Sequence, residues 1–345
     1  MQACDISELL TFDYAYGRPT ASGILKQEAK DFRVDEVLGF EPSGDGQHRM
    51  LQIQKSNTNT EWVAKQLARY VDIKLRDVSY AGLKDRNAIT TQWFSIDLAG
   101  KTEPDWSDFN CSEYQILASF SHNKKLRRGS LKGNRFEIVI KDLQGDRDEL
   151  EQRLLKIQKY GVPNYFGPQR FGHSGDNLLQ AWMMLQGEKK VKDRNRRGIY
   201  LSAARSLIFN QLLSQRVADG SWSQILTGEA VMLAGSSSYF IVTTDDATIS
   251  QRLRDWDIHP SGPMWGRGEL PSLDEARIRE AMVCNRFADW LAPLELAGLK
   301  QDRRALRLQV SNFSWQWSEQ QDLCLQFELV SGSYATSVIR ELVLV

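Results

Sequence analysis

The stretch Ala81-Gly-Leu-Lys-Asp-Arg-Asn-Ala-Ile-Thr-Thr-Gln-Trp-Phe-Ser-Ile-Asp97 joins a turn to a strand. Its first seven residues contain glycine, asparagine and charged side chains, which favour turns. From Thr91 onward β-forming residues dominate and alternate around Trp93 and Ser95, as in a strand with one buried face. The sequence therefore predicts that Asp85 lies in a loop that enters a strand.

A second strand is predicted N-terminal to this loop, in Asp31-Phe-Arg-Val-Asp-Glu-Val37. Phe32 and Val34 share one face by the two-residue period, and Glu36 falls on that same apolar face. A carboxylate there needs a partner, so we expect Glu36 to bond a backbone donor or a basic core residue. A further strand is predicted over residues 135–141, after a basic run.

Helical patterns dominate the middle of the chain. Leu150, Leu154 and Ile157 recur at helical spacing, and the helix is expected to stop at Gly161-Val-Pro163. Alternation returns at residues 322–329, which predicts a strand near the C-terminus. Strand-rich ends around a helix-rich middle suggest an inserted domain with boundaries near residues 160 and 308.

Two capping boxes are also predicted. Thr58 with Glu61, and Ser272 with Glu275, have the spacing that begins a helix. The first pair precedes an apolar set with helical spacing. That set is Val63, Leu67, Tyr70 and Val71.

The composition bounds the class of protein. The chain has 345 residues, 41% hydrophobic and 26% charged, with 44 basic and 44 acidic side chains, so two domains are expected and any basic surface must be local. Four scattered cysteines argue against a disulfide framework and a structural zinc site. There is neither a long apolar run nor a signal-peptide pattern, so we expect a soluble cytoplasmic protein, monomeric and without an obligatory protein partner.

Cofactor motifs are missing from the sequence. It contains no phosphate-binding loop, dinucleotide fingerprint, nucleophile elbow or zinc-protease motif. The four histidines are too scattered to predict a ligand set. We therefore expect neither a cofactor nor a metal.

Basic residues cluster at 124–135 and 189–205, where they could track an RNA backbone or simply form solvated faces. Between the clusters, Asn164-Tyr-Phe-Gly-Pro-Gln-Arg-Phe-Gly172 alternates rings with glycines and one arginine. Its rings could stack on unpaired bases or form a packed loop. The candidate contacts to RNA phosphates are Lys124, Lys125, Arg127, Arg128, Lys132, Arg170, Arg194, Arg196 and Arg197.

Asp85 stands between Lys84 and Arg86, either of which could hold its carboxylate ionised as a usable nucleophile. A charged triplet alone has little value, because most such aspartates are structural or solvated. The wider context, residues 81–92, resembles the signature of the TruD family of tRNA pseudouridine synthases. Blocks at 26–36, 131–136, 164–172 and 332–341 extend this resemblance in order and spacing.

The resemblance implies an α+β fold: a pseudouridine-synthase catalytic core with a mixed, mainly antiparallel sheet, interrupted by a family-specific α/β insertion. The catalytic domain would comprise residues 1–159 and 309–345, and the insertion residues 160–308. Little resemblance is visible between about residues 220 and 300, so no functional residue is carried over there.

The resemblance also implies the site. Asp85 matches the catalytic aspartate and Lys26 the active-site lysine, which would pair with Asp85. Asn134 and Phe136 match the residues that contact and stack on the uracil base. Lys84 and Phe32 could serve the pocket or merely support it.

The implied reaction isomerises uridine 13 in the D-stem region of tRNA to pseudouridine, with the base flipped out of the helix. Asp85 would attack C1′ of the sugar or C6 of the base, or assist formation of a glycal, and the sequence leaves these routes open. Two other classes remain. One is a tRNA chaperone, which would not need a buried carboxylate near phosphate; the other is a nuclease that holds magnesium with Asp85 and Asp31 or Glu36.

Overall fold

The computed structural model describes residues 3–244 and 246–345, which form two compact units. Unit 1 consists of the residues up to Thr20, Arg147–Gln309 and Ser333–Val343. Unit 2 consists of Ala21–Asp146, Val310–Gly332 and the last two residues. Met1 and Gln2, part of the stretch in which no signal peptide was predicted, lie outside the described residues.

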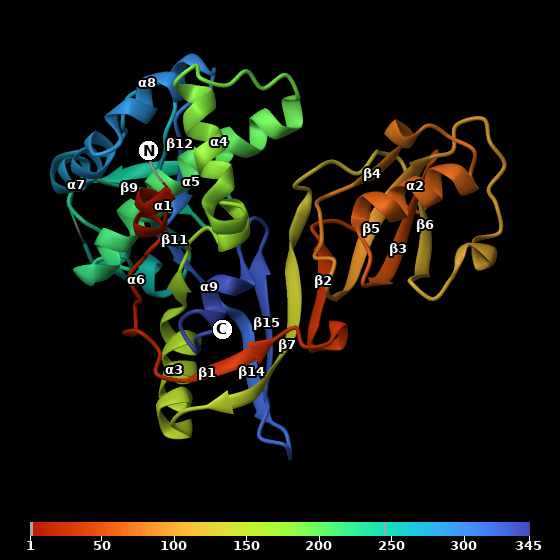
Figure 1. Ribbon diagram of the computed structural model, residues 1–345, viewed down its shortest axis with the longest axis horizontal. Helices are drawn as coiled ribbons and strands as arrows, with labels where there is room; N and C mark the ends of the chain where they lie inside the picture. The colour runs from red at the N-terminus through yellow and green to blue at the C-terminus, as the bar shows by residue number, and fades with distance from the viewer. Residues whose placement is uncertain (1–2, 245) are drawn as a thin grey trace. The chain divides into compact units, whose positions relative to one another are not determined.

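Unit 2 is built on one nine-stranded sheet with the path β14-β15-β7-β2-β5-β3-β6 (Figure 1). Strand β1 pairs with β7, and β4 pairs with β5. The pair of β2 and β5 is parallel and the other pairs are antiparallel. The strands are β1 (Ser22–Leu25), β2 (Phe32–Leu38), β3 (His48–Ser56), β4 (Val78–Tyr80), β5 (Ile89–Asp97), β6 (Tyr114–His122), β7 (Leu131–Gln144), β14 (Ser311–Trp317) and β15 (Leu323–Val330).

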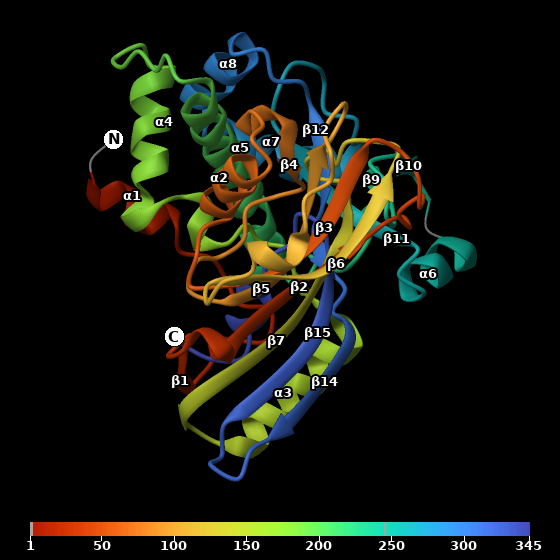
Figure 2. The same cartoon turned by 90° about the vertical axis from the view of Figure 1, so that its right-hand side faces the viewer.

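Helix α2 (Thr60–Tyr70) covers the part of this sheet formed by β3 and β5. Its buried Val63 and Leu67 pack in one cluster with Ile53 and Phe94, as the helical spacing predicted. Figure 2 shows the other part of the sheet, where β7, β15 and β14 run side by side. Three short 3₁₀ helices complete the unit: Ala29–Asp31, Leu75–Asp77 and Trp106–Phe109.

Unit 1 combines helices with a four-stranded sheet in the order β10-β9-β11-β12 and a two-stranded pair, β8 with β13. The helices are α1 (Ala3–Leu9), α3 (Arg147–Tyr160), α4 (Asp176–Leu185), α5 (Arg194–Ala218), α6 (Ala247–Arg254), α7 (Asp274–Asn285), α8 (Ala288–Leu296) and α9 (Ala335–Ile339), with 3₁₀ turns at Pro168–Arg170 and His173–Gly175. The strands are β8 (Val162–Pro163), β9 (Glu229–Leu233), β10 (Tyr239–Val242), β11 (Ile258–Met264), β12 (Asp302–Ala305) and β13 (Arg307–Leu308).

The predicted end of α3 at Gly161 is confirmed. Gly161 has a φ of +71°, and a Cβ atom there would lie only 2.2 Å from the carbonyl oxygen of Leu308. Glycine is therefore required both by the left-handed turn and by the close approach of β13.

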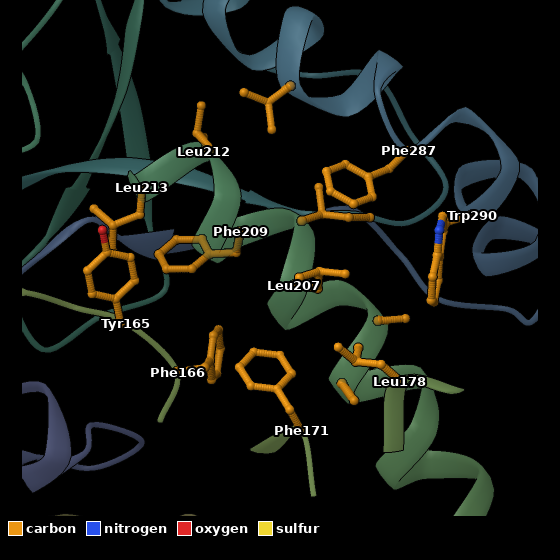
Figure 3. Packing of buried hydrophobic residues seen from close by; sticks show 14 of the residues in the cluster. Tyr165, Phe166, Phe171, Leu178, Leu207, Phe209, Leu212, Leu213, Phe287 and Trp290 are labelled. Carbon is orange, nitrogen blue, oxygen red and sulfur yellow. The ribbon is translucent and has the colours of Figure 1, made fainter. Parts of the chain in front are cut away.

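The core of unit 1 surrounds α5 and includes the aromatic rings of residues 164–172 (Figure 3). Tyr165, Phe166 and Phe171 are all buried and pack with Phe209 and Leu178. These rings are core residues, so their stacking on RNA bases, one of the two possibilities left open by the sequence, is wrong for the described structure. The packed-loop alternative is confirmed.

Both predicted capping boxes are wrong. Helix α2 begins after Asn59, and no side chain caps it. Helix α7 begins after Leu273, while the Ser272 hydroxyl donates to the buried Glu280 carboxylate instead. In the second case a tertiary hydrogen bond replaces the local one.

The α+β class with mainly antiparallel sheets is confirmed. The range predicted as an insertion, residues 160–308, falls within unit 1 together with α3 and segments from both ends of the chain. Its status as an insertion in a catalytic domain stays a prediction. Among the described helices, none is long and apolar enough to cross a membrane.

Candidate active site

Asp85 lies in the loop of residues 81–88, which connects β4 to β5 in unit 2. These strands are antiparallel neighbours, with Val78 opposite Ile96 and Tyr80 opposite Phe94. Both ends of the loop are therefore fixed to the same sheet. The predicted position of Asp85, in a loop that enters a strand, is confirmed.

Lys26 and Asp85 form an ion pair. Lys26 Nζ donates to Asp85 Oδ2 at 2.7 Å, and the two side chains are 27% and 42% exposed. The same ammonium lies 4.0 Å from the centre of the Phe32 ring, within the range of a cation–π contact. Solvent reaches the Asp85 carboxylate, so our expectation of a buried carboxylate was wrong.

The backbone of Lys26 is held in an unusual conformation. Its φ is +55°, in the left-handed region that costs a residue with a Cβ atom roughly 1–2 kcal/mol. The preceding residue, Leu25, is held opposite Ile140 by the pairing of β1 with β7. Such strain persists where surrounding structure enforces it, and it is common at functional sites.

Side chains from α2 and β5 hold the loop around Asp85. The Thr60 hydroxyl accepts from the backbone amide of Lys84 at 3.1 Å and donates to Gln92 Oε1 at 2.7 Å. Gln92 Nε2 donates in turn to the Gly82 carbonyl at 3.4 Å. Because Thr60 and Gln92 are buried, the loop backbone on the N-terminal side of Asp85 is tied to the core.

Lys55 of β3 holds the backbone of Asp85 itself. Its Nζ donates to the Asp85 carbonyl at 2.9 Å and to the Thr58 carbonyl at 2.7 Å. Burial lowers the pKa of Lys55 to about 8, against the opposing effect of the Asp85 charge. We did not predict a role for Lys55 from the sequence, although this residue continues the buried face of Leu51 and Ile53 at the two-residue period.

Lys84 contacts Glu36 and not Asp85. Its Nζ lies 2.7 Å from Glu36 Oε1, and the lysine side chain is only 9% exposed. This distance is short for a contact between an ammonium and a carboxylate, so the two side chains form a close ion pair. Glu36 Oε2 accepts from the backbone amide of Trp93 at 2.8 Å.

The environment of Glu36 is mainly a desolvating one. Burial raises the pKa of the Glu36 carboxyl, while the Lys84 charge opposes that shift. Both partners anticipated for Glu36, a backbone donor and a basic core residue, are present. For Lys84 the geometry favours the supporting role, because its ammonium faces the core.

Asn134 and Phe136 share a face of β7 beside β2. Asn134 lies opposite Glu36, and Phe136 lies opposite Val34. The side-chain amide oxygen of Asn134, Oδ1, is buried without a hydrogen-bond partner among the described residues. An unsatisfied buried acceptor is costly, so it marks a place where a ligand donor would be favoured.

Phe136 is 6% exposed and belongs to an aromatic cluster. Its ring is stacked on Phe327 with centroids 5.2 Å apart and meets Phe32 edge to face at 6.3 Å. Phe32 is also buried, under the Lys26 ammonium. Both rings therefore contribute to packing, whatever else they contact.

The basic candidates of unit 2 are on the surface. Lys124, Lys125, Arg127, Arg128 and Lys132 are exposed. Their segment adjoins the Asp85 loop, because the amide at position 129 donates to the carbonyl at position 81 at 2.9 Å.

The candidates of unit 1 differ among themselves. Arg194 and Arg196 are exposed and Arg197 is half-buried in the first turn of α5. Arg170 is half-buried, and its guanidinium donates to the Ser202 and Tyr334 hydroxyls at 2.8 and 2.5 Å. Arg170 is thus largely engaged within the protein.

The carboxylates considered for magnesium have other partners. Asp31 Oδ1 lies 2.9 Å from Lys141 Nζ, and Glu36 is bound by Lys84. Each of these carboxylates and Asp85 therefore faces its own lysine, an arrangement that does not favour a shared cation.

Comparison with known proteins gives one consistent result. A family model described as tRNA pseudouridine synthase D (TruD) matches residues 9–192 and 185–342. The tRNA pseudouridine synthase D of Nitrosococcus oceani is 48% identical over 333 residues, covering 95% of this chain and 93% of the relative. That of Proteus mirabilis is 45% identical over 343 residues, covering 98% and 97%.

A solved structure agrees in fold. The crystal structure described as tRNA pseudouridine synthase D from Methanosarcina mazei matches with a TM-score of 0.74 at 22% identity, covering 99% of this chain and 98% of that one. Sequence and fold similarity thus extend over nearly the whole chain, and the protein belongs to the tRNA pseudouridine synthase D (TruD) family.

Proposed function

We propose that the protein is an isomerase that converts uridine 13 in the D-stem region of tRNA to pseudouridine, with Asp85 as the catalytic carboxylate. The observation that carries this proposal is the solvent-accessible Lys26–Asp85 ion pair on a loop fixed by buried side chains. A carboxylate that is already held in position can react without the entropy cost of ordering it first.

The chemistry is balanced without an added reactant. The N1–C1′ bond of uridine breaks, the base turns, and a C5–C1′ bond forms; C5 loses its proton and N1 gains one. Asp85 would attack C1′ or C6, or assist formation of a glycal. The Lys26 ammonium would keep the Asp85 carboxylate charged by opposite-charge stabilisation.

Recognition of the base would use β7. The unsatisfied side-chain oxygen of Asn134, Oδ1, is a suitable acceptor for the N3–H of uracil. Asn134 lies opposite Glu36, whose carboxylate holds the residue immediately before Asp85. Because the target base is stacked within RNA, it would have to be flipped out before it could reach this position.

The decisive experiment incubates the protein with unmodified tRNA transcripts in chelator and maps pseudouridine by carbodiimide primer stops. We expect one new stop at a D-stem uridine, absent with Asp85→Asn, whose RNA affinity should stay within a few-fold of wild type. Asp72→Asn removes a carboxylate from a fully exposed position of the same unit and serves as the matched control.

Each other outcome has a definite meaning. Tight binding without a stop on any transcript would favour the chaperone alternative. Retained turnover in Asp85→Asn would show that Asp85 is not the catalytic carboxylate. Activity on the transcripts that appears only when magnesium is added would favour the nuclease alternative.

A further inference from the structure

Leu83 is an apolar side chain presented to solvent two residues before Asp85. It is 66% exposed, whereas the intervening Lys84 points inward to Glu36. The side chains of Leu83 and Asp85 are 66% and 42% exposed, whereas that of Lys84 between them is only 9% exposed, so residues 83 and 85 face solvent and residue 84 faces the core. Leu83 and Asp85 therefore share the open face of the loop.

The loop cannot readily withdraw Leu83 into the core, because the backbone is bonded on both sides of it. The carbonyl of Gly82 accepts from Gln92, and the amide of Lys84 donates to Thr60. The carbonyl of Ala81 accepts from the amide of residue 129 in the basic segment. Single exposed leucines are common, but this one is displayed by a fixed backbone beside a reactive carboxylate.

The space next to Leu83 is open. Leu83 is 66% exposed, so the described chain leaves most of this side chain uncovered. The exposed basic segment that contains Arg127 and Arg128 adjoins the loop through the hydrogen bond to Ala81. A polyanion bound to those arginines would thus bring its bases toward an apolar tip.

We propose that Leu83 is a wedge that enters the RNA stack at the place vacated by the flipped uridine. This inference rests on the proposed function. Removing one nucleotide from a stack with a rise of about 3.4 Å leaves a gap of roughly 7 Å between its neighbours. Leu83 and Asp85 are two residues apart and both are exposed, so Leu83 can enter this gap while Asp85 faces the extruded nucleotide.

Apolar side chains are suited to this task. Leucine, isoleucine, phenylalanine and methionine are the residues with which proteins separate stacked bases, because they replace the lost base contacts without competing for hydrogen bonds. Leu83 is a specificity and positioning residue in this scheme, since it contacts the substrate away from the reacting atoms.

The first test reads unstacking directly and needs no turnover. The target uridine is located with wild-type enzyme, and 2-aminopurine then replaces its 3′ neighbour in the same tRNA. Saturating Asp85→Asn protein should change the fluorescence markedly as the neighbour loses its stacking partner. The double variant Asp85→Asn/Leu83→Ala should show at most half of that fluorescence change. In the control double variant Asp85→Asn/Leu117→Ala, which alters an exposed leucine of β6, the loss should be smaller than half.

The second test compares turnover on two substrates. With intact tRNA, Leu83→Ala should lower kcat/KM about tenfold, and Leu83→Met should retain most of the activity. With a transcript that is abasic beside the target, the deficit of Leu83→Ala should shrink to less than about threefold, because little stacking remains to be disrupted.

Two results would overturn the wedge: an unchanged 2-aminopurine signal in Leu83→Ala, or an equal loss of turnover on both substrates. Absence of pseudouridine from wild-type reactions is a separate failure, which would refute the proposed function itself. Thermal unfolding should be unaltered in Leu83→Ala, since this side chain is mostly exposed.

Discussion

Phe136 is a packing residue that we also propose as a contact of the uracil base. Its ring stacks on Phe327 and meets the edge of Phe32, and it is nearly buried. Phe136→Ala should therefore lower the free energy of unfolding by about 3–5 kcal/mol, in addition to any loss of roughly 1–3 kcal/mol of base stacking. Urea unfolding measures the first effect, and single-turnover kinetics on intact tRNA measures the second.

Phe136→Leu separates the two roles. Leucine keeps most of the buried volume, so the loss of stability should be smaller, while the flat ring needed for stacking is gone. Reduced turnover in a stably folded Phe136→Leu protein would support the contact with the base. Turnover equal to wild type would mean that the ring only packs the core.

Single residues of the site were predictable to different degrees. Glu36 was identified because a carboxylate on an apolar strand face must find a partner, and it has two. The same argument applied to Lys55 would have identified a buried ammonium on β3. The position of Asp85 followed from turn chemistry, whereas its pairing with Lys26, 59 residues away in sequence, was suggested only by family resemblance.

At the level of elements, the basic segment of residues 124–130 is more than a charged loop. The amide of Leu126 donates to the Ser95 hydroxyl of β5 at 2.9 Å, and Leu126 itself is buried. The segment is therefore fixed to the same strand that follows the Asp85 loop. Arg127 and Arg128 are exposed on this anchored backbone.

Replacing Arg127 and Arg128 together with glutamine should weaken tRNA binding and flatten its dependence on salt. Each lost phosphate contact reduces the slope of log K against log salt by about 0.7–0.9, so the pair should reduce it by about 1.4–1.8. Lys65→Gln with Arg69→Gln removes the same charge from exposed positions of α2 and should leave the slope unchanged. A slope equal to wild type in the first variant would mean that this segment does not contact phosphate.

Periodicity predicted the interiors of elements better than their ends. The buried faces of α2, α3 and β15 follow the spacings in the sequence. The capping box predicted at Ser272 was wrong because a capping motif considers only neighbouring residues. The Ser272 hydroxyl instead donates to the buried Glu280, which also pairs with Arg303. Such a partner, distant in sequence, leaves no local pattern.

At the scale of the whole molecule, each unit is built from segments that lie far apart in the sequence. Unit 1 is assembled from an N-terminal segment, a long central segment and a segment near the C-terminus. Glu341 joins all three: its carboxylate accepts from the amide of Tyr16 at 3.3 Å, and its carbonyl accepts from Arg153 at 3.1 Å. No periodic pattern in the sequence encodes this connection.

Glu341 should make the stability of unit 1 depend on pH. Burial raises the pKa of its carboxyl from 4.5 to about 7, against the opposing charge of Arg340. Between these values the folded state holds a proton that the unfolded state has released, so the contribution of Glu341 to stability is most favourable below about pH 4.5 and falls as the pH rises to about 7. The contribution of this group is on the order of 3 kcal/mol.

Glu341→Gln should remove that component, because an amide does not titrate. We expect hydrogen exchange in peptides containing Tyr16 to accelerate, relative to the variant, as wild type is taken from pH 5 to pH 7 after correction for the intrinsic rate. Glu319→Gln, an exposed carboxylate in unit 2, should behave like wild type. Parallel pH profiles for wild type and Glu341→Gln would show that the carboxyl is not protonated in this range, so that its attraction to Arg340 outweighs the burial of its charge.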